Sequence, residues 1–435
     1  MLSANPQAQT IAMRILVLTN LYPPHYVGGY ELRCRDITEA LRDRGHTMQV
    51  LTSSYMAAGA GTGQKPGCLV ERSLRLHGFF GHPWLGIRDL RSLEQDNNAA
   101  LLAAIQSFKP DLVHVWNLGG LSKSLALTLQ RLNIPTVFDV SDHWIARSLV
   151  GDVWLDWWNR DSASVSARVA RGMWTATGKR DLWHRQAPTN PLRHLRFQRI
   201  YFCSARLREI TVKAGYVVKH GEVIHCPVNV AAYDGEVKPM ATPLKKLLYA
   251  GRLSEDKGIL TALQAMLAVK DEFHGALEVY GKGEPEYEAM LKGFVATHAL
   301  PVTFHSASPE QMPEVYRSHD ALLFTSEWEE PFALTPLEAM ASGLPVIGTT
   351  TGGSAELFEH GGNALTYAAG NARQLADRIL QLDRDPQLRH DIAASGRRLV
   401  RERFNLPAIV SQIEAYLDQS LRLWQRTDLP HYLEA

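Results

Sequence analysis

Residues 326–343 of the chain read SEWEEPFALTPLEAMASG. An apolar run, residues 321–324, precedes this stretch, and residues 344–347 form a second apolar run after it. The pattern predicts a buried strand, an acidic loop, a short helix and another strand. Strands that alternate with helices are typical of parallel sheets, so this stretch indicates an α/β fold.

The start of the predicted helix has a purely local explanation. Thr335 suits the N-cap, Pro336 suits the first helical position, and Glu338 follows three residues after Thr335, which completes a capping box. Gly343 is a suitable helix end. This explanation leaves out the other glutamate, Glu330, which follows the first strand. In doubly wound sheets, ligands bind at the carboxyl ends of strands, so a binding role for both glutamates is the alternative.

Length and composition limit the kinds of protein that this chain can be. A chain of 435 residues suggests two domains of about 200 residues each. Its 45% hydrophobic and 21% charged residues are typical of a globular protein. A formal net charge of +1 argues against a dedicated nucleic-acid binder, which needs a strong basic excess.

The cysteines and the hydropathy pattern indicate where the protein works. The 4 cysteines are scattered without paired metal-type spacing, so we expect neither disulfides nor a zinc site. The first dozen residues lack the apolar core of a signal peptide, and no run approaches the ~18 apolar residues of a membrane span. We therefore expect a cytoplasmic protein, with peripheral contact at the inner face of the membrane as a further possibility.

The first half of the chain begins with a glycine loop after a strand. Residues 14–20 contain the continuous apolar run 15–18, Gly28 and Gly29 follow, and a helical pattern covers residues 30–44. Backbone N–H groups and the helix dipole at such a position can bind an anion. A plain tight turn is the alternative.

Further strands of the first half are predicted at residues 111–116, 135–140, 200–204 and 223–225. The second of these ends at Asp142 and His143, which places both residues at the carboxyl edge of the sheet. The aromatic loop 78–84 is a candidate lining for an acceptor pocket, and a packed loop is the alternative.

Residues 144–183 hold 6 of the 10 tryptophans, interleaved with arginines and lysines. Amphipathic aromatic and basic side chains suit sugar stacking, capture of an anionic substrate or a membrane interface. The alternative is a pair of covering helices whose tryptophans pack inward.

A second series of strands and helices follows a proline-containing linker at residues 227–245. We predict an N-terminal domain at residues 1–230 and a C-terminal domain at residues 231–407. The amphipathic helix of residues 408–435 can return to either domain. The fold class is thus α/β, with two parallel-sheet domains facing each other across a cleft, where a small molecule binds by default.

Several motifs then occur in a recognisable order. Residues 22–31 contain Tyr-Pro-Pro and Gly-Gly-Tyr-Glu, residues 251–258 contain Gly-Arg-Leu and Lys-Gly, and residues 330–345 hold the two glutamates. Together they resemble the motifs of the retaining glycosyltransferases of family 4 (glycosyl transferases group 1). The resemblance covers nearly the whole chain and implies the GT-B fold of two Rossmann-like domains.

The resemblance implies a role for each charged residue of the second half. Arg252 and Lys257 would clamp the diphosphate of a nucleotide sugar and act as catalytic residues. Glu338 would bind the substrate by accepting hydrogen bonds from the ribose, and Glu330, a further catalytic residue, would bind hydroxyls of the donor sugar. Neither glutamate would then work as a general acid or base.

The resemblance also implies the remaining site residues and the mechanism. Backbone N–H groups of Phe332, Ala333 and Leu334 would face the sugar and phosphate, and Gly28 and Gly29 would bind the substrate from the other domain. The acceptor would attack the face that the nucleotide leaves, with the departing diphosphate as base. No metal and no cofactor would be needed beyond the UDP- or GDP-linked donor.

The chain departs from the family pattern at three places. Ser141 stands where many members have a histidine before Asp142, and His143 follows two positions later. Asp142 and His143 are candidate catalytic residues. Ala333 replaces a usual glycine and restricts the backbone. Residues 226–229 read Cys-Pro-Val-Asn where Asn-Gly is usual.

The leading hypothesis is a retaining transferase that acts on a carbohydrate or lipid-linked acceptor, with possible membrane contact through residues 144–185. A GT-B nucleotide-sugar epimerase or a phosphorylase is a second hypothesis. A non-catalytic nucleotide-sugar-binding homologue is the third, which the Ser141 departure keeps open.

Overall fold

The computed structural model describes residues 12–57, 68–147, 152–160, 164–235 and 243–426. The chain forms two compact units. Unit 1 comprises Met1–Cys203, Leu207–Ile224 and Val410–Ala435, and unit 2 comprises Ser204–Arg206 and His225–Ile409. The chain therefore passes into unit 2 shortly before the predicted boundary at 230, and residues 236–242 of the predicted linker lie outside the described ranges.

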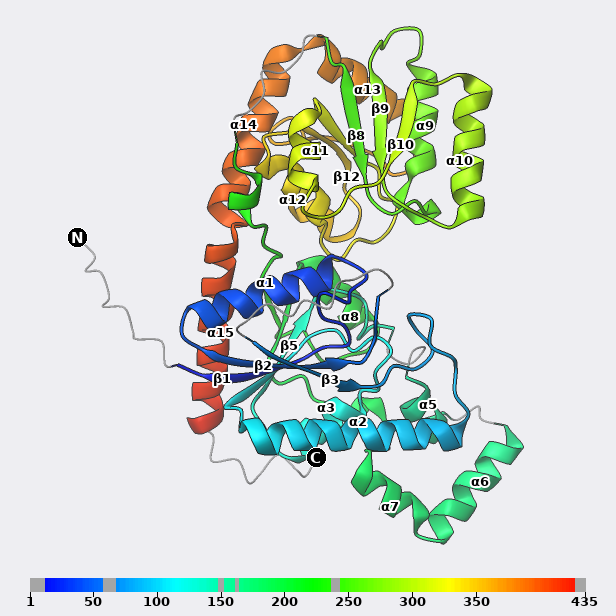
Figure 1. The fold of residues 1–435 in the computed structure, drawn as a ribbon, viewed down its shortest axis with the longest axis vertical. Helices are drawn as coiled ribbons and strands as arrows, with labels where there is room; N and C mark the ends of the chain where they lie inside the picture. Colours follow the sequence, from blue (N-terminus) through cyan, green and yellow to red (C-terminus); the bar gives the residue numbers. More distant parts are fainter. Residues whose placement is uncertain (1–11, 58–67, 148–151, 161–163, 236–242, 427–435) are drawn as a thin grey trace, which may run out of the picture. The chain divides into compact units, whose positions relative to one another are not determined.

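Unit 1 is built on a seven-stranded sheet in which every pairing is parallel (Figure 1). In spatial order its strands are β3 (Leu69–Leu74), β2 (Thr47–Ser53), β1 (Arg14–Leu18), β4 (Leu112–Val115), β5 (Thr136–Val140), β6 (Ile200–Phe202) and β7 (Glu222–Val223). The predicted strands are present. The central strands β1, β4, β5 and β6 have nearly continuous apolar runs and are buried on both faces, whereas the edge strands β3 and β7 are partly exposed.

Helices cover both faces of this sheet. Figure 1 shows α1 on one side of it and α2 and α3 on the other. The helices of unit 1 are α1 (Gly29–Asp43), α2 (Ile87–Phe108), α3 (Ser124–Arg131), α5 (Val153–Asn159), α6 (Val165–Ala176), α7 (Lys179–Gln186) and the greater parts of α8 (Ala205–Lys213) and α15 (Leu406–Arg426). A short 3-10 helix, Leu192–His194, lies before β6.

The C-terminal helix α15 has a defined partner. The Tyr416 hydroxyl donates to the Ile200 carbonyl at 2.9 Å, and it accepts from the Ile200 N–H at 3.0 Å. The Arg199 guanidinium donates to Ser420 Oγ at 2.8 Å and lies over the Tyr416 ring. The sequence left both domains open as the partner, and these bonds beside β6 place residues from Val410 on with unit 1.

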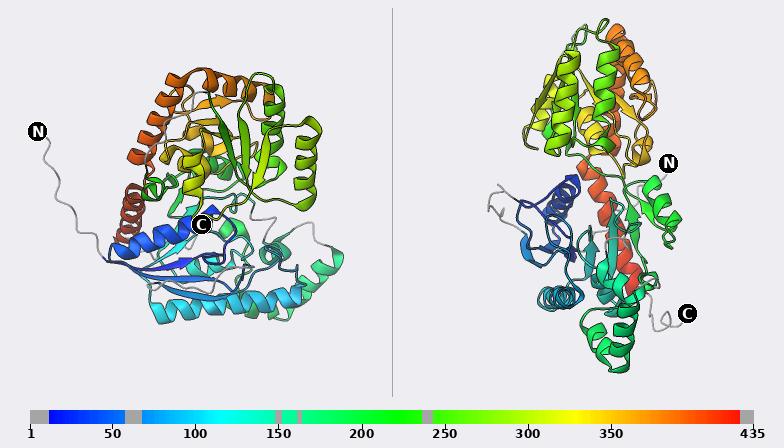
Figure 2. Two further views of the ribbon diagram at one scale, coloured as in Figure 1. Left: turned by 45° about the horizontal axis from the view of Figure 1, so that its top comes forward. Right: turned by 90° about the vertical axis from the view of Figure 1, so that its right-hand side faces the viewer.

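Unit 2 repeats the architecture with six parallel strands (Figure 2). In spatial order they are β10 (Val302–His305), β9 (Ala276–Tyr280), β8 (Lys246–Ala250), β11 (Ala321–Phe324), β12 (Val346–Thr349) and β13 (Leu365–Tyr367). Its helices are α9 (Ile259–Ala268), α10 (Pro285–His298), α11 (Met312–Ser318), α12 (Leu334–Ala341), α13 (Ala372–Arg384) and α14 (Pro386–Arg403). Four 3-10 turns occur in the described chain, and those of unit 2 are Val230–Tyr233, Glu255–Lys257 and Gly352–Glu356.

The strand order of each sheet reverses once. In unit 1 the reversal lies between β1 and β4, and in unit 2 it lies between β8 and β11. Loops that leave the carboxyl ends of such neighbours run in opposite directions and leave a crevice for a ligand. The fold therefore directs attention to the loops after β1 and β4 and to the loops after β8 and β11.

Unit 1 also encloses a polar network between α2, α3 and α5. The Glu94 carboxylate accepts from Ser124 Oγ at 3.0 Å. Asp152 accepts from the Lys123 N–H at 2.7 Å and from the Leu155 N–H at 3.0 Å, so it caps α5. Burial, reinforced by the Asp152 charge, raises the pKa of Glu94 to about 8. A carboxyl that stays protonated near neutral pH can remain buried without a counter-ion.

This network predicts how stability depends on pH. The folded pKa of Glu94 lies above its unfolded value, so its contribution is fully present below about pH 4.5 and is lost as the pH rises toward about 8. We expect the free energy of unfolding to fall across this window by about 1 to 4 kcal/mol. Glu94→Gln should remove that fall, which urea unfolding at pH 5 and pH 8 measures.

The matched control is Asp96→Asn, on the same helix, whose side chain is 57% exposed. It should leave the dependence on pH as in the wild type. An unchanged pH dependence in Glu94→Gln would show that another group titrates.

Candidate functional site

The central contact of unit 2 joins the loop after β8 to the loop after β11. Lys257 Nζ donates to Glu330 Oε1 at 2.6 Å, and Ser326 Oγ donates to the same oxygen at 2.6 Å. The two charged side chains are 22% and 10% exposed. They are thus shielded enough to strengthen the ion pair but remain within reach of a ligand. Lys257 and Glu330, both predicted from the sequence, meet here.

The backbones of the same two loops also touch. Gly258 has φ +65°, and a Cβ there would lie 2.0 Å from the Thr325 carbonyl oxygen. Thr325 Oγ1 donates to the Lys257 carbonyl at 2.8 Å. Only glycine combines this left-handed conformation with so close an approach. The glycine of the Lys-Gly motif therefore sets the position of Lys257.

Glu327 holds the two loops together through bonds to Thr261 and to the Asp256 backbone. Its carboxylate accepts from Thr261 Oγ1 at 2.7 Å, and its N–H donates to the Asp256 carbonyl at 2.9 Å. Sequence reasoning placed Glu327 within an acidic cluster without a separate role. The structure makes it a brace between the acidic loop and the start of α9.

Arg252 follows β8 and has an exposed guanidinium. Its side chain is 67% exposed, and Nη2 lies 3.9 Å from Asp256 Oδ2. The Tyr249 hydroxyl donates to the Arg252 carbonyl at 2.9 Å, which fixes the backbone from which the side chain extends. A long, exposed guanidinium on a fixed backbone can reach and bind an anion with two N–H groups.

Helix α12 begins earlier than predicted, so the predicted capping box is wrong. Its N-cap is Ala333, whose side chain cannot cap, and Thr335 and Pro336 lie inside the helix. Within the described residues, the backbone N–H groups of Phe332, Ala333 and Leu334 have no hydrogen-bond partner. An uncapped helix N-terminus can bind an anion or a polar ligand through these groups.

Glu338 does not turn back to the helix start. Its Oε2 accepts from the Tyr316 hydroxyl at 2.7 Å, and Tyr233 supplies a further hydrogen bond. Burial raises the pKa of Glu338, against these two hydrogen bonds. The physical reason for the failed prediction is that two phenols from other elements compete with the backbone for this carboxylate. Tyr316 and Tyr233 lie too far from Glu338 in the sequence for a local pattern to predict these bonds.

The glycine loop of unit 1 is already occupied by a side chain of its own helix. Gly28 precedes α1 in an extended conformation, and its N–H donates to Glu31 Oε2 at 2.8 Å. Glu31 is buried, and this burial raises its pKa. In this structure the Gly28 N–H therefore binds Glu31, and Gly29 is the first residue of α1.

Asp142 and His143 lie just after β5, as predicted. Asp142 Oδ1 accepts from the His143 N–H at 2.6 Å, and His143 is buried. Beside them, Ser141 Oγ accepts from Arg33 Nη1 at 2.7 Å and donates to Asp139 Oδ1 at 2.9 Å. The serine that departs from the family pattern thus belongs to a buried ionic network.

That network rests on an ion pair that sequence reasoning missed. Arg33 Nη2 lies 2.8 Å from Asp139 Oδ2, and the two side chains are 2% and 0% exposed. Arg33 also lies over the Trp116 ring at 4.9 Å. An arginine on the apolar face of the predicted helix was the available sign of a buried partner.

A second missed set tethers the acidic loop. Arg206 makes two hydrogen bonds to the Glu329 carboxylate, at 2.9 and 3.0 Å, and Ser204 Oγ donates to the Pro331 carbonyl at 2.6 Å. These residues lie more than a hundred positions apart in the chain, so no local pattern could pair them.

The chain contains one Asp-x-Asp tripeptide, Asp383-Arg384-Asp385. Asp383 accepts from the Leu244 N–H at 2.8 Å, and Asp385 caps α14 through the Leu388 N–H at 2.9 Å. Both carboxylates therefore hold backbone groups.

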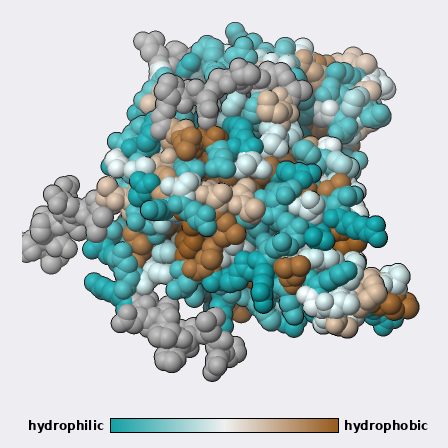
Figure 3. Space-filling view, turned by 60° about the horizontal axis from the view of Figure 1, so that its bottom comes forward, coloured by the Kyte–Doolittle hydropathy of each residue, from teal (hydrophilic) through white to brown (hydrophobic). Residues whose placement is uncertain are grey.

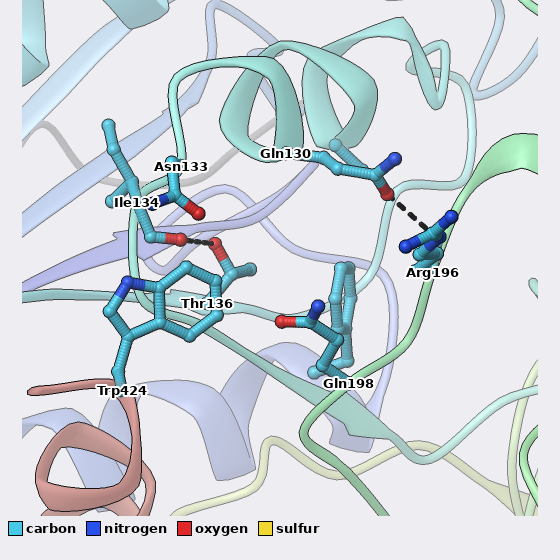
Figure 4. A pocket seen from close by; sticks show the side chains of 9 residues that line it. Gln130, Asn133, Ile134, Thr136, Arg196, Gln198 and Trp424 are labelled. Atoms are coloured by element: carbon cyan, nitrogen blue, oxygen red, sulfur yellow. Dashed lines mark hydrogen bonds between the residues drawn. The ribbon is translucent and has the colours of Figure 1, made fainter. Parts of the chain in front are cut away.

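Unit 1 has a pocket near the amino end of β5, whereas Asp142 and His143 follow its carboxyl end (Figure 4). Figure 4 shows the Trp424 ring beside Ile134 and Thr136, and at another side of the pocket the Arg196 N–H donates to Gln130 Oε1 at 2.8 Å. Its lining comprises Ala126, Gln130, Asn133, Ile134, Thr136, Phe138, Arg196, Gln198 and Trp424. It contains none of the predicted site residues.

Family models match both units. The model described as Glycosyl transferases group 1 matches residues 236–399, and that of the Glycosyl transferase 4-like domain matches residues 28–178. Together they cover most of the chain, including Lys257, Glu330 and Glu338. The chain belongs to the group 1 glycosyltransferase family. Its site residues in unit 2 therefore lie within the part of the chain that the group 1 model matches.

Individual relatives of this glycosyltransferase family member are distant. It is 30% identical over 178 residues to N-acetyl-alpha-D-glucosaminyl L-malate synthase of Bacillus anthracis, with 41% of this chain and 46% of that protein covered. It is 23% identical over 415 residues to the glycogen synthase of Mycobacterium tuberculosis (strain H37Rv), covering 92% and 93%. The chain spans about half the length of several curated relatives that it matches, including the B. anthracis synthase.

Solved structures agree on the fold. The Anabaena protein HepE, solved in complex with UDP-glucose, is 20% identical with a TM-score of 0.66, covering 94% of this chain and 100% of that one. With two Rossmann-like parallel-sheet units, the family member has the predicted GT-B fold.

The close approach at Gly258 predicts a large effect of one methyl group. Gly258→Ala should lower the free energy of unfolding of unit 2 by more than about 2 kcal/mol, because both the left-handed backbone and the Thr325 contact become strained. Thermal or urea unfolding measures this. Gly293→Ala is the matched control, since a Cβ there has no neighbour within 4 Å and lies in α10. A stability equal to that of the control would contradict the proposed constraint.

Proposed function

We propose that this protein transfers a sugar from a nucleotide diphosphate sugar, UDP- or GDP-linked, to a carbohydrate or lipid-linked acceptor. The observation that carries the proposal is the Lys257–Glu330 contact at 2.6 Å, made where the sheet order of unit 2 reverses. A few residues after Glu330, the backbone N–H groups of Phe332, Ala333 and Leu334 at the start of α12 are suited to bind an anionic ligand.

The diphosphate of the donor would be bound by the two cations of unit 2. Arg252 and Lys257 lie on the same loop after β8, and their charges would bind its oxygens. Lys257 would share its ammonium between Glu330 and the phosphate, because an ammonium has three donors. These cations would stabilise the charge that develops on the leaving nucleotide.

The two glutamates would bind hydroxyl groups rather than transfer protons. Glu330 would accept from the donor sugar, and Ser326 together with Lys257 holds its carboxylate in place. Glu338 would accept from the ribose. A carboxylate has about four lone-pair sites, so its bonds to Tyr316 and Tyr233 leave capacity for ribose hydroxyls.

Unit 1 would supply the acceptor side. Asp142 and His143 follow β5 and are proposed to contact the reacting sugar, and Gly28 and Gly29 the substrate at the start of α1. For Gly28 this requires the Glu31 carboxylate to leave its N–H. The Arg33–Asp139 pair and Ser141 hold the strand end that carries Asp142.

We propose a retaining, front-face reaction. The acceptor oxygen forms a bond to the anomeric carbon on the face from which the diphosphate departs, through an oxocarbenium-like state. The acceptor proton passes to the departing diphosphate, so the chain need not supply a base. The protein contributes positioning and fixed charge, and Arg252 and Lys257 act where other glycosyltransferases use a metal.

The proposed substrates also indicate where in the cell the protein works. Within the described residues, no helix is sufficiently long and apolar to cross a bilayer. A donor made in the cytoplasm and a lipid-linked acceptor would meet at the inner membrane face, so we propose a cytoplasmic protein with peripheral contact there through the 144–185 segment. The structure of HepE with UDP-glucose supports UDP-glucose as the first donor to test.

Removal of either cation should abolish transfer. Arg252→Ala and Lys257→Ala are each expected to lower kcat/KM by about 100-fold or more, since each removes a charge that stabilises the leaving group. A thermal-shift panel of nucleotide sugars identifies the donor first, because the tightest binder stabilises most. Turnover is then measured as release of the free nucleotide in the presence of candidate acceptors.

Lys270→Ala is the matched control, because Lys270 is an exposed cation of the same unit outside the site. It should keep wild-type activity. Full activity in either site variant would exclude the diphosphate clamp. Conversion of the donor without any acceptor would favour an epimerase, and binding without product would favour a non-catalytic protein. The anomeric configuration of the product, read by NMR, tests retention.

A further inference from the structure

The tryptophans of residues 144–183 do not form a surface. Trp154, Trp158 and Trp183 are buried, and Trp157 and Trp174 complete a cluster of five indoles. The closest ring centroids, in the Trp157–Trp158 and Trp174–Trp183 pairs, are 4.8 Å apart. The alternative predicted from the sequence, covering helices whose tryptophans pack inward, therefore describes this segment. A membrane role cannot rest on the tryptophans.

The opposite face of α6 is where apolar groups meet solvent. Val165, Val169 and Met173 are 67%, 64% and 55% exposed. They are spaced four residues apart and so form one stripe along the helix. Gly172 and Ala176 lie on the same face, and Trp174 lies on the inward one. No residue of α6 is buried.

Such a stripe is unusual for a water-exposed helix, whose outer face is normally polar. Leu182 of α7 is a further apolar residue at 56% exposure. Residues 164–186 thus hold 4 of the 14 exposed large hydrophobic residues in the described chain. In Figure 3, pale and brown residues gather at the lower right, where α6 lies.

The stripe is flanked by positive charge. Residues 164–186 contain five basic residues and one acidic residue, a net charge of +4, whereas the whole chain carries +1. Arg168, Lys179 and Arg185 are exposed. The basic residues are Arg168, Arg171, Lys179, Arg180 and Arg185, and the acidic one is Asp181.

We propose that the outer face of α6, with Leu182 of α7, docks on an anionic lipid surface. An amphipathic helix with an apolar face and flanking arginines lies in the plane of such a surface and buries its apolar side chains at the headgroup boundary. Its cations pair with the negative headgroups. A second copy of the chain is a poorer occupant, since it would place +4 against +4.

The α6–α7 segment is firmly attached to the rest of unit 1. Arg91 of α2 lies over the Trp183 ring at 4.5 Å, and Arg131 of α3 donates to the His184 carbonyl at 3.1 Å. Docking of α6 would therefore orient unit 1 at the surface. Delivery of a lipid-linked acceptor is the purpose of this contact only if the proposed function holds, but the contact itself is measured without donor or acceptor.

The test is flotation of the full chain with vesicles of phosphatidylcholine alone or mixed with phosphatidylglycerol. Wild-type protein should float with the anionic vesicles at low salt and be released by high salt. The double variant Val169→Asp, Met173→Asp should bind at least about tenfold more weakly, because it places two anions on the stripe. Val217→Asp is the matched control, at an exposed valine of unit 1 outside the segment, 87% exposed, and should bind like the wild type.

Two results would overturn the proposal. One is a wild-type protein that does not float with anionic vesicles, which would leave a protein partner for this face. The other is a double variant that floats as well as the wild type. Circular dichroism confirms that the variants fold. The nucleotide-sugar thermal shift should be unchanged in the double variant, so failure of lipid binding and failure of the proposed function are told apart.

Discussion

The parallel pairing of β8 with β11 is the constraint on which the site of unit 2 depends. These strands are neighbours in space but are separated in sequence by two strands and three helices. Their carboxyl ends meet at one edge, so the loops that leave them come into contact. Gly258 allows the two backbones to touch at Thr325, and Lys257 then reaches Glu330. Without the glycine, the ion pair would lose its geometry.

In unit 1, a buried ion pair holds the carboxyl end of β5 in place. Arg33 of α1 bonds Asp139 of β5, and Ser141 accepts from one and donates to the other. A buried charge is tolerated only with such partners. The Ser141 hydroxyl fits between the two charged groups because it can accept from Arg33 and donate to Asp139 at once. The network supports Asp142 and His143 directly after it.

One sequence feature separates into two structural roles. The tryptophans and arginines of residues 144–183 alternate along the chain, but the helices turn the indoles inward and leave valines, a methionine and a leucine outside. Arg171 and Arg180 lie over indole rings, whereas Arg168 and Arg185 are exposed. Packing thus decides which residues of a mixed segment can meet a partner.

Much of the fold followed from local pattern. Continuous apolar runs identified most strands, glycines and prolines marked helix ends, and the alternation indicated two parallel sheets. The short strand β13 and the helices α3 and α8 were not predicted, because three to nine residues carry little periodicity. For the site, Lys257 and Glu330 were identified from their motifs, but their contact was not derivable from the sequence.

The sequence by itself determined the fold class, the family and the residues that carry charge in the site, since each depends on residue type and order along the chain. The tertiary structure alone decided which groups those residues meet. Glu338 bonds Tyr316 rather than the start of its own helix, and the Gly28 N–H bonds Glu31. Hydrogen bonds form between groups that are close in space. For residues on different elements, that proximity is set by the tertiary fold and cannot be read from the local sequence.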